Sequence, residues 1–241
     1  MITIHHIEGR RSERVVWLLE EIGRIPYKLE FVTGDVLRSL LRLEPVHEMR
    51  MTPIVQDGEL TIIESGAILE YLLAEHAKGS PLRPREGTRE LARYLEFMHF
   101  AEGTAMARIL LDFTLRRLGT SDPMPALPGL AGSRSQSERV MYFSDHVLGE
   151  QRFFAGDAFT AADIMMHFPM KLGAAVATKA QFVIGDVYRT DHAYLDPFPN
   201  VKRWLKEVMA RPGGSHRGRT CRQRHLDGAL PGRPRSPDDD E

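Results

Sequence analysis

The chain has 241 residues, of which 42% are hydrophobic and 27% charged, and its formal net charge is −1 at pH 7. This length allows one large domain or two small ones. The near-neutral charge argues against a dedicated nucleic-acid-binding or membrane-surface protein, and no apolar run approaches the ~20 residues of a membrane span. The single cysteine, Cys221, excludes an internal disulfide and a Cys-x-x-Cys pair. A cytoplasmic protein is therefore expected.

The first 78 residues alternate between strand and helix patterns. Strands are predicted at 2–7, 27–33, 54–55 and 60–63, and helices at 12–22, 35–43 and from Ser65 onward. Asp57-Gly58 lies between the last two strands and is typical of a β-hairpin. The opening strand-helix-strand order implies a parallel pair with a right-handed crossover. This order of elements predicts a thioredoxin-like α/β domain.

The pattern becomes helical after a Gly- and Pro-containing linker at 79–87. Apolar residues at helical spacing predict one long amphipathic helix over 88–118. A loop at 119–137 precedes helices predicted at 140–148, 160–177 and 201–210. Thr160 and Asp163 resemble a capping box, which is a folding signal. We therefore expect a helical domain at 88–212 and, from its arginine-rich composition, a disordered tail at 213–241.

Two polar corners flank the predicted hairpin. The Thr52-Pro53 bond can be cis at modest cost, and the Thr52 backbone would then pair with an extended peptide-like ligand; the alternative is a strand that simply begins with proline. Glu64 and Ser65 stand at a helix start, where free N–H groups and the helix dipole attract an anion. Glu64 would take an ammonium group beside it. The alternative there is ordinary N-capping.

A third polar group lies at the turn before the first helix. The Ser12 hydroxyl can donate to a ligand thiolate, and Arg10 and Arg11 can add positive potential. Lowering a thiol pKa of ~8.5 by two units requires roughly 2.7 kcal/mol, and one hydrogen bond to a charged group contributes about 1.5–3 kcal/mol. The alternative is that Ser12 only caps the helix. The ten histidines show no metal-ligand spacing.

Five motifs, in order along residues 1 to about 212, resemble those of cytosolic glutathione transferases of the bacterial and fungal type. They are RVVWLLEE at 14–21, HEMRMTP at 47–53, ESGAI with a following YL at 64–72, FAGD with FTAADI at 154–164, and FPNV with Trp204 and Arg211-Pro212. The resemblance implies a thioredoxin-like α/β N-terminal domain followed by an all-α C-terminal domain.

The resemblance also implies an activity. The thiolate of glutathione would add to an electrophilic, apolar small molecule, with glutathione as co-substrate and with no other cofactor or metal. Glu64 and Ser65 would hold the γ-glutamyl end, and the backbone of Thr52 would pair with the cysteinyl part. His47 and Arg50 would reach the glycyl carboxylate. Members of the family are typically homodimers, and their helical domain supplies the second-substrate pocket, here mainly from 93–118.

The chain departs from the family at the turn that activates the thiol. Arg10 stands where serine-type members carry the thiolate-stabilising serine, four residues before Arg14, and Ser12 lies two residues further on. Ser12 and Arg10 are therefore the catalytic candidates. This turn has no tyrosine, and its lack of cysteine argues against a glutaredoxin-like reductase. Two alternatives remain open: a glutathione-binding or regulatory protein without transferase activity, and a glutathione-dependent hydroperoxide reductase.

Overall fold

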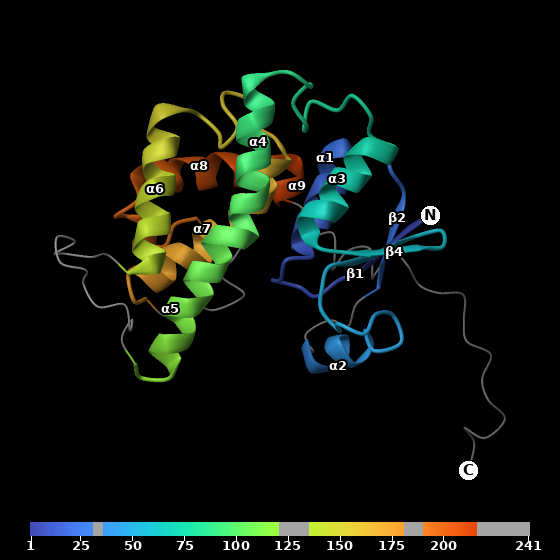
Figure 1. The fold of residues 1–241 in the computed structure, drawn as a ribbon, viewed down its shortest axis with the longest axis horizontal. Coiled ribbons are helices and arrows are strands. Elements are labelled where there is room, and N and C mark those ends of the chain that lie inside the picture. The colour runs from blue at the N-terminus through green and yellow to red at the C-terminus, as the bar shows by residue number, and fades with distance from the viewer. Residues whose placement is uncertain (31–35, 121–134, 181–189, 216–241) are drawn as a thin grey trace, which may run out of the picture.

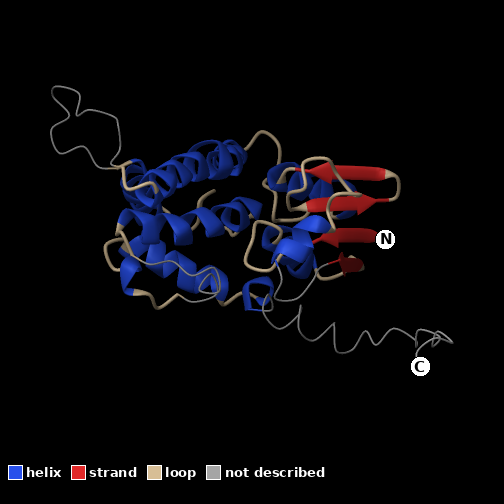
Figure 2. Ribbon diagram, turned by 90° about the horizontal axis from the view of Figure 1, so that it is seen from below, coloured by secondary structure: helices blue, strands red, loops and turns tan. Residues whose placement is uncertain are grey.

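The computed structural model describes residues 1–30, 36–120, 135–180 and 190–215 (Figure 1). An α/β unit and an all-helical unit lie side by side, with the strands at one end of the molecule (Figure 2). The predicted fold class is thus confirmed. Within these described ranges, no helix is both long and apolar enough to cross a membrane.

The α/β unit is built on a four-stranded sheet in the order β2-β1-β3-β4. Its strands are β1 (Ile2–His5), β2 (Tyr27–Glu30), β3 (Ile54–Asp57) and β4 (Leu60–Ile63). β1 and β2 are parallel, with Ile2 opposite Tyr27, as the strand-helix-strand pattern predicts. β3 and β4 form the predicted antiparallel hairpin, which also pairs with β1. Thr52-Pro53 leads into β3 and Glu64-Ser65 follows β4, so both polar corners lie at the ends of strands in the same sheet as β1.

Helices cover both faces of this sheet. α1 (Glu13–Ile22) and α3 (Ser65–His76) bury their apolar residues with Ile4 and Val55 in the main core. Ile54, which points to the opposite face from Val55 because side chains alternate along a strand, packs instead with Ile7 and Leu43, just after α2 (Val36–Leu41). The starts of α1 and α3 consequently lie on the same side of the sheet.

The helical unit contains α4 (Arg89–Phe100), α5 (Ala107–Arg117), α6 (Gln136–Glu150), α7 (Ala161–Ala177), α8 (Pro199–Met209) and α9 (Pro212–Ser215). A 3₁₀ turn at Ala193–Leu195 precedes α8. The prediction of one continuous helix over 88–118 is wrong in one respect. A π-helical turn, Ala101–Met106, separates α4 from α5. Such turns are rare and occur frequently at functional sites.

α7 lies at the centre of the helical unit and begins at the predicted capping box. The fully buried Asp163 carboxylate accepts hydrogen bonds from the Thr160 N–H at 2.9 Å, the Phe154 N–H at 3.0 Å and the Trp204 indole N–H at 2.9 Å. Burial raises the pKa of Asp163 to about 6, and these donors oppose the rise. One carboxylate thereby joins the start of α7 to the preceding loop and to α8.

The C-terminal part of the described chain packs against α1. Arg211 forms an ion pair with Glu21 at 2.9 Å, and its guanidinium lies 4.0 Å from the centroid of the Phe159 ring. Gly213 fits so closely that an added Cβ would lie 2.2 Å from Cδ1 of Trp17. The predicted disordered tail therefore begins too early, because residues 213–215 are helical and Gly213 and Gly214 are buried. Its remainder, 216–241, lies outside the described residues.

Candidate functional site

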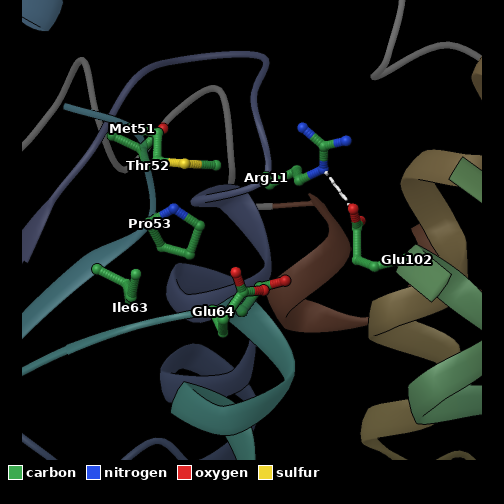
Figure 3. A pocket seen from close by; sticks show the side chains of 8 residues that line it. Arg11, Met51, Thr52, Pro53, Ile63, Glu64 and Glu102 are labelled. Atoms are coloured by element: carbon green, nitrogen blue, oxygen red, sulfur yellow. Dashed lines mark hydrogen bonds and ion pairs between the residues drawn. The ribbon is translucent and has the colours of Figure 1, made fainter. Parts of the chain in front are cut away.

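A cavity of about 130 Å³ opens at the start of α3, between the two units (Figure 3). Thr52 and Pro53 form one side, Arg11 and Glu102 stand on the opposite side, and Glu64 lies below and between these two sides in the view. The predicted residues Thr52, Pro53, Glu64 and Ser65 are thus brought together. The full lining is Arg11, Met51, Thr52, Pro53, Ile63, Glu64, Ser65 and Glu102.

The Thr52-Pro53 bond, the first of the two polar corners, is cis. Pro53 is buried and leads directly into β3, so Thr52 is held at the end of a sheet strand. Arg50, two residues earlier, has a φ of 47°, in the left-handed region that non-glycine residues rarely occupy. The loop before the proline is therefore sharply bent as it enters the cavity wall.

Glu64, at the second corner, also has a left-handed backbone, with φ 71° and ψ 110°. A non-glycine residue in such a region costs on the order of 1–3 kcal/mol, and such residues cluster at active sites and ligand clamps. The Glu64 side chain makes no capping hydrogen bond to α3 and is exposed at the cavity. The Glu64 carboxylate thus faces the cavity rather than its own helix.

Ser65 is the first residue of α3, and its hydroxyl is oriented by a buried arginine. Arg14 Nη1 donates to Ser65 Oγ at 2.9 Å, which leaves the hydroxyl proton free to donate to a ligand. In the described part of the chain, the N–H groups of Ser65 and Gly66 make no hydrogen bond. These donors and the positive end of the helix dipole favour an anion at this point.

Sequence reasoning missed Glu102, which enters the cavity from the π-helical turn of the other unit. Its carboxylate accepts from Arg14 Nη1 at 2.6 Å and lies 2.9 Å from Arg11 Nε. Arg14 is buried and also donates through Nη2 to the Met165 carbonyl at 2.7 Å. Burial lowers the pKa of Arg14, and Glu102 opposes that shift. Arg11, Arg14 and Glu102, here called the arginine-glutamate cluster, therefore connect both units at the cavity.

The two predicted catalytic residues do not line this cavity. Ser12 is fully buried, and its hydroxyl donates to the Ile7 carbonyl at 3.1 Å and accepts from the Ile7 N–H at 3.0 Å. Arg10 is half-buried in the same turn, and its N–H donates to the Ile7 carbonyl at 3.2 Å. Arg11, between them in sequence, is the residue of this turn that reaches the cavity. The direction of each side chain follows from the fold of the turn rather than from residue type.

His47 and Arg50 lie in the loop between α2 and β3, outside the cavity lining. His47 Nδ1 accepts from the Met49 N–H at 3.2 Å, and the exposed Arg50 forms a 2.5 Å ion pair with Glu44. An exposed ion pair is worth about 0–1 kcal/mol, so Arg50 can exchange Glu44 for a ligand carboxylate at small cost. That His47 and Arg50 reach the glycyl carboxylate of a ligand stays a prediction.

No group of three or more potential metal ligands occurs among the described residues. A second cavity, of about 290 Å³, lies beside α2 and contains none of the predicted site residues. The cavity at the start of α3 is smaller, but it combines left-handed backbone, open N–H donors and opposite charges. That combination suits a zwitterionic, peptide-like ligand.

Two family models match the chain. The glutathione S-transferase N-terminal domain matches residues 1–74, and the glutathione S-transferase C-terminal domain matches residues 131–212. The chain is 31% identical over 228 residues to glutathione S-transferase 3 of Schizosaccharomyces pombe, covering 88% of this chain and 84% of that protein. It is 27% identical to glutathione S-transferase F13 of Arabidopsis thaliana, covering 80% and 81%.

Solved structures share the fold. A glutathione S-transferase from Actinobacillus pleuropneumoniae aligns with a TM-score of 0.69 at 20% identity, over 91% of this chain and 92% of that one. A glutathione transferase from Phanerochaete chrysosporium, in complex with oxidized glutathione, aligns with a TM-score of 0.66 at 22% identity, over 91% and 95%. At these identities the likeness concerns the fold alone.

Proposed function

Because the chain belongs to the glutathione S-transferase family, we propose that it is a glutathione transferase that binds glutathione at the start of α3. It transfers the thiolate to an electrophilic, apolar small molecule. The observation that carries the proposal is the cavity in which Thr52, Glu64 and Ser65 meet the arginine-glutamate cluster. A tripeptide with one ammonium group, two carboxylates and a thiol complements the charges and donors of this cavity.

Each part of glutathione has a proposed partner. The Glu64 carboxylate takes the ammonium group of the γ-glutamyl residue, and the Ser65 hydroxyl and nearby N–H groups take its carboxylate. The Thr52 backbone pairs with the cysteinyl part, as an added strand would. His47 and Arg50 approach the glycyl carboxylate. The apolar second substrate occupies the side of the cavity that faces α4 and α5.

The reaction needs an ionised thiol and a fixed geometry. The thiolate sulfur attacks the electrophilic carbon of the second substrate, a carbon-sulfur bond forms, and a leaving group such as halide departs with its electron pair. The protein contributes by positioning the two reactants and by stabilising the anion before the attack. No redox cofactor or metal takes part in this step, so glutathione is proposed as co-substrate without a further cofactor.

One observation favours a second function, glutathione binding or regulation without turnover. The Ser12 hydroxyl is held by Ile7 and lies outside the cavity lining. A protein that lacked a group to activate the thiol would bind glutathione and not transfer it. Reduction of hydroperoxides by glutathione is a third candidate on the same site, and a substrate panel distinguishes it from conjugation.

The test compares wild type with Glu64→Ala and with Glu59→Ala, an exposed carboxylate in the β3–β4 turn that serves as a matched control. Calorimetric titration with glutathione is expected to give binding for wild type and for the control, and binding weakened 10–100-fold for Glu64→Ala. Conjugation to an aryl halide then separates transferase from binding protein. Equal affinity in all three proteins would contradict the proposed site.

We also propose that the protein acts in the cytoplasm as a homodimer, in keeping with its family. Exposed apolar side chains on the long helical pair, Leu95, Leu110 and Leu111, support an interface that includes α4 and α5. Light scattering on the purified chain is expected to give twice the chain mass of 27.3 kDa. A monomer at micromolar concentration would overturn the dimer while leaving the glutathione site intact.

A further inference from the structure

Activation of the thiol requires a donor that faces the cavity, and the Ser12 hydroxyl is already engaged. Its one proton goes to the Ile7 carbonyl at 3.1 Å, and its oxygen accepts from the Ile7 N–H at 3.0 Å. Both residues are buried. Turning the hydroxyl toward a ligand would leave the buried Ile7 N–H without its acceptor, at about 1–3 kcal/mol, whereas the Ile7 carbonyl would keep the Arg10 N–H as a donor at 3.2 Å. Ser12 therefore holds the turn closed.

Arg11 is oriented differently. Its Nε donates to the Glu102 carboxylate at 3.0 Å, while its side chain lines the cavity (Figure 3). The Arg11 Cζ lies 5.9 Å from the Phe168 ring centroid, which supports the guanidinium from the helical unit. Among the described residues, its two terminal amino groups have no hydrogen-bond partner. A guanidinium carries five N–H donors, so four of them remain for a ligand.

The neighbouring charges leave Arg11 as the cation that can act on a ligand. Arg14 is buried and donates to Ser65 Oγ, the Met165 carbonyl and Glu102. The Glu102 carboxylate is thus held by an ion pair with Arg14 Nη1 at 2.6 Å, and it in turn holds Arg11 through Nε. Two cations share one carboxylate, so the arginine-glutamate cluster keeps an excess of one positive charge. That excess lies beside the start of α1, and Arg11 presents it to the cavity.

We infer that Arg11 is the catalytic residue that stabilises the glutathione thiolate, in place of a hydroxyl. This inference rests on the proposed function, because it requires glutathione in the α3 cavity. The guanidinium supplies both a full positive charge and charge-assisted N–H···S hydrogen bonds, which favour an anion over a neutral thiol. Glu102 and Arg14 act as positioning residues, since Arg14 holds the Glu102 carboxylate and that carboxylate holds Arg11 at the cavity.

The experiment measures the pKa of the bound glutathione thiol, from the ultraviolet absorption of its thiolate as a function of pH. Wild type is compared with Arg11→Gln, with Arg11→Lys, and with Arg24→Gln, which removes an exposed arginine beyond the other end of α1. Arg11→Gln is expected to raise the thiol pKa by about one to two units, a 10–100-fold loss of preference for the anion. Arg11→Lys restores part of the shift, and Arg24→Gln leaves it unchanged.

Steady-state kinetics provide the second readout. Loss of the thiolate lowers kcat/KM of Arg11→Gln at neutral pH by the same 10–100-fold, and activity recovers at alkaline pH, where the thiol ionises unaided. A purely structural role would lower activity equally at every pH. The inference is overturned if Arg11→Gln binds glutathione with an unchanged thiol pKa, or if Ser12→Ala or Arg10→Gln raises that pKa and Arg11→Gln does not. Absence of glutathione binding by wild type would instead overturn the proposed function.

Discussion

The N-termini of α3 and α7 show how one local structure serves two purposes. At α7, Asp163 closes the helix start: it accepts the Thr160 N–H, and the Ala161 N–H donates to the Leu82 carbonyl at 2.9 Å. At α3, Glu64 makes no capping bond, its backbone is left-handed, and its carboxylate is open to the cavity. A helix start with satisfied donors stabilises the fold, whereas one with unused donors has capacity left for a ligand.

The largest expected effect comes from removing the Asp163 carboxylate at the start of α7. Asp163→Ala removes the acceptor of three buried donors, on Phe154, Thr160 and Trp204. Each unsatisfied buried donor costs about 1–3 kcal/mol, so a combined loss of at least about 3 kcal/mol in the free energy of unfolding is expected. Urea denaturation measures it. The exposed Asp157→Ala, six residues earlier, serves as control and should change stability by less than about 0.5 kcal/mol.

At the start of α3, removal of the Glu64 carboxylate should lower the affinity for glutathione without a matching loss in the free energy of unfolding. Glu64→Ala and Glu64→Gly both remove the proposed ammonium partner, so glutathione affinity falls 10–100-fold in both, equivalent to about 1.5–3 kcal/mol. Glycine accepts a φ of 71° freely, whereas alanine does not. Thermal unfolding should therefore show Glu64→Gly to be more stable than Glu64→Ala by about 1 kcal/mol. Equal stabilities would mean that the Glu64 backbone stores no strain.

Both helix starts could be predicted from sequence, because their signals are local. Thr160 and Asp163 form a capping box at fixed spacing, and Asp57-Gly58 fixes the hairpin that leads to Glu64. These signals depend on a few neighbouring residues and on hydrogen bonds within them. The parallel β1–β2 pair and the β3–β4 hairpin follow from the same local patterns, and the succession of an α/β and an all-helical unit follows from these patterns and from the family resemblance.

The residues that complete the cavity could not be predicted in this way. Arg10, Arg11 and Ser12 are adjacent, and which of them faces the ligand depends on the hydrogen bonds between Ser12 and Ile7. Glu102 lies 91 residues from Arg11 in sequence and meets it only because the two units pack together. In sequence, Glu102 is one acidic residue in a helical pattern, and nothing local marks the π-helical turn that carries it.

The titration of Asp163, at the start of α7, should make the stability of the protein depend on pH. The pKa of Asp163 is raised to about 6 in the folded protein, above the ~3.9 of an unfolded aspartate. Folding therefore favours the protonated carboxyl. The contribution of Asp163 protonation to the free energy of unfolding is fully present below pH ~4 and is lost as the pH rises through about 6. Between pH 5 and pH 7 the stability advantage of wild type over Asp163→Asn should shrink by about 1 kcal/mol. An advantage that grows with pH would show that the donors outweigh burial.

The smallest expected effect comes from substituting Gly66 and tests whether the start of α3 has the residue that most favours a helix. Gly66, the second residue of α3, has an ordinary φ, and a Cβ added there would lie 3.6 Å from Met165 Cε, a normal contact. Since alanine is the better helix former, Gly66→Ala should stabilise the protein by about 0.5 kcal/mol. The reverse change at the exposed neighbour, Ala67→Gly, should destabilise it by a similar amount. Paired thermal melts measure both. If Gly66→Ala is destabilising, the start of α3 is packed as tightly as that of α7, and its open donors reflect crowding rather than space kept for a ligand.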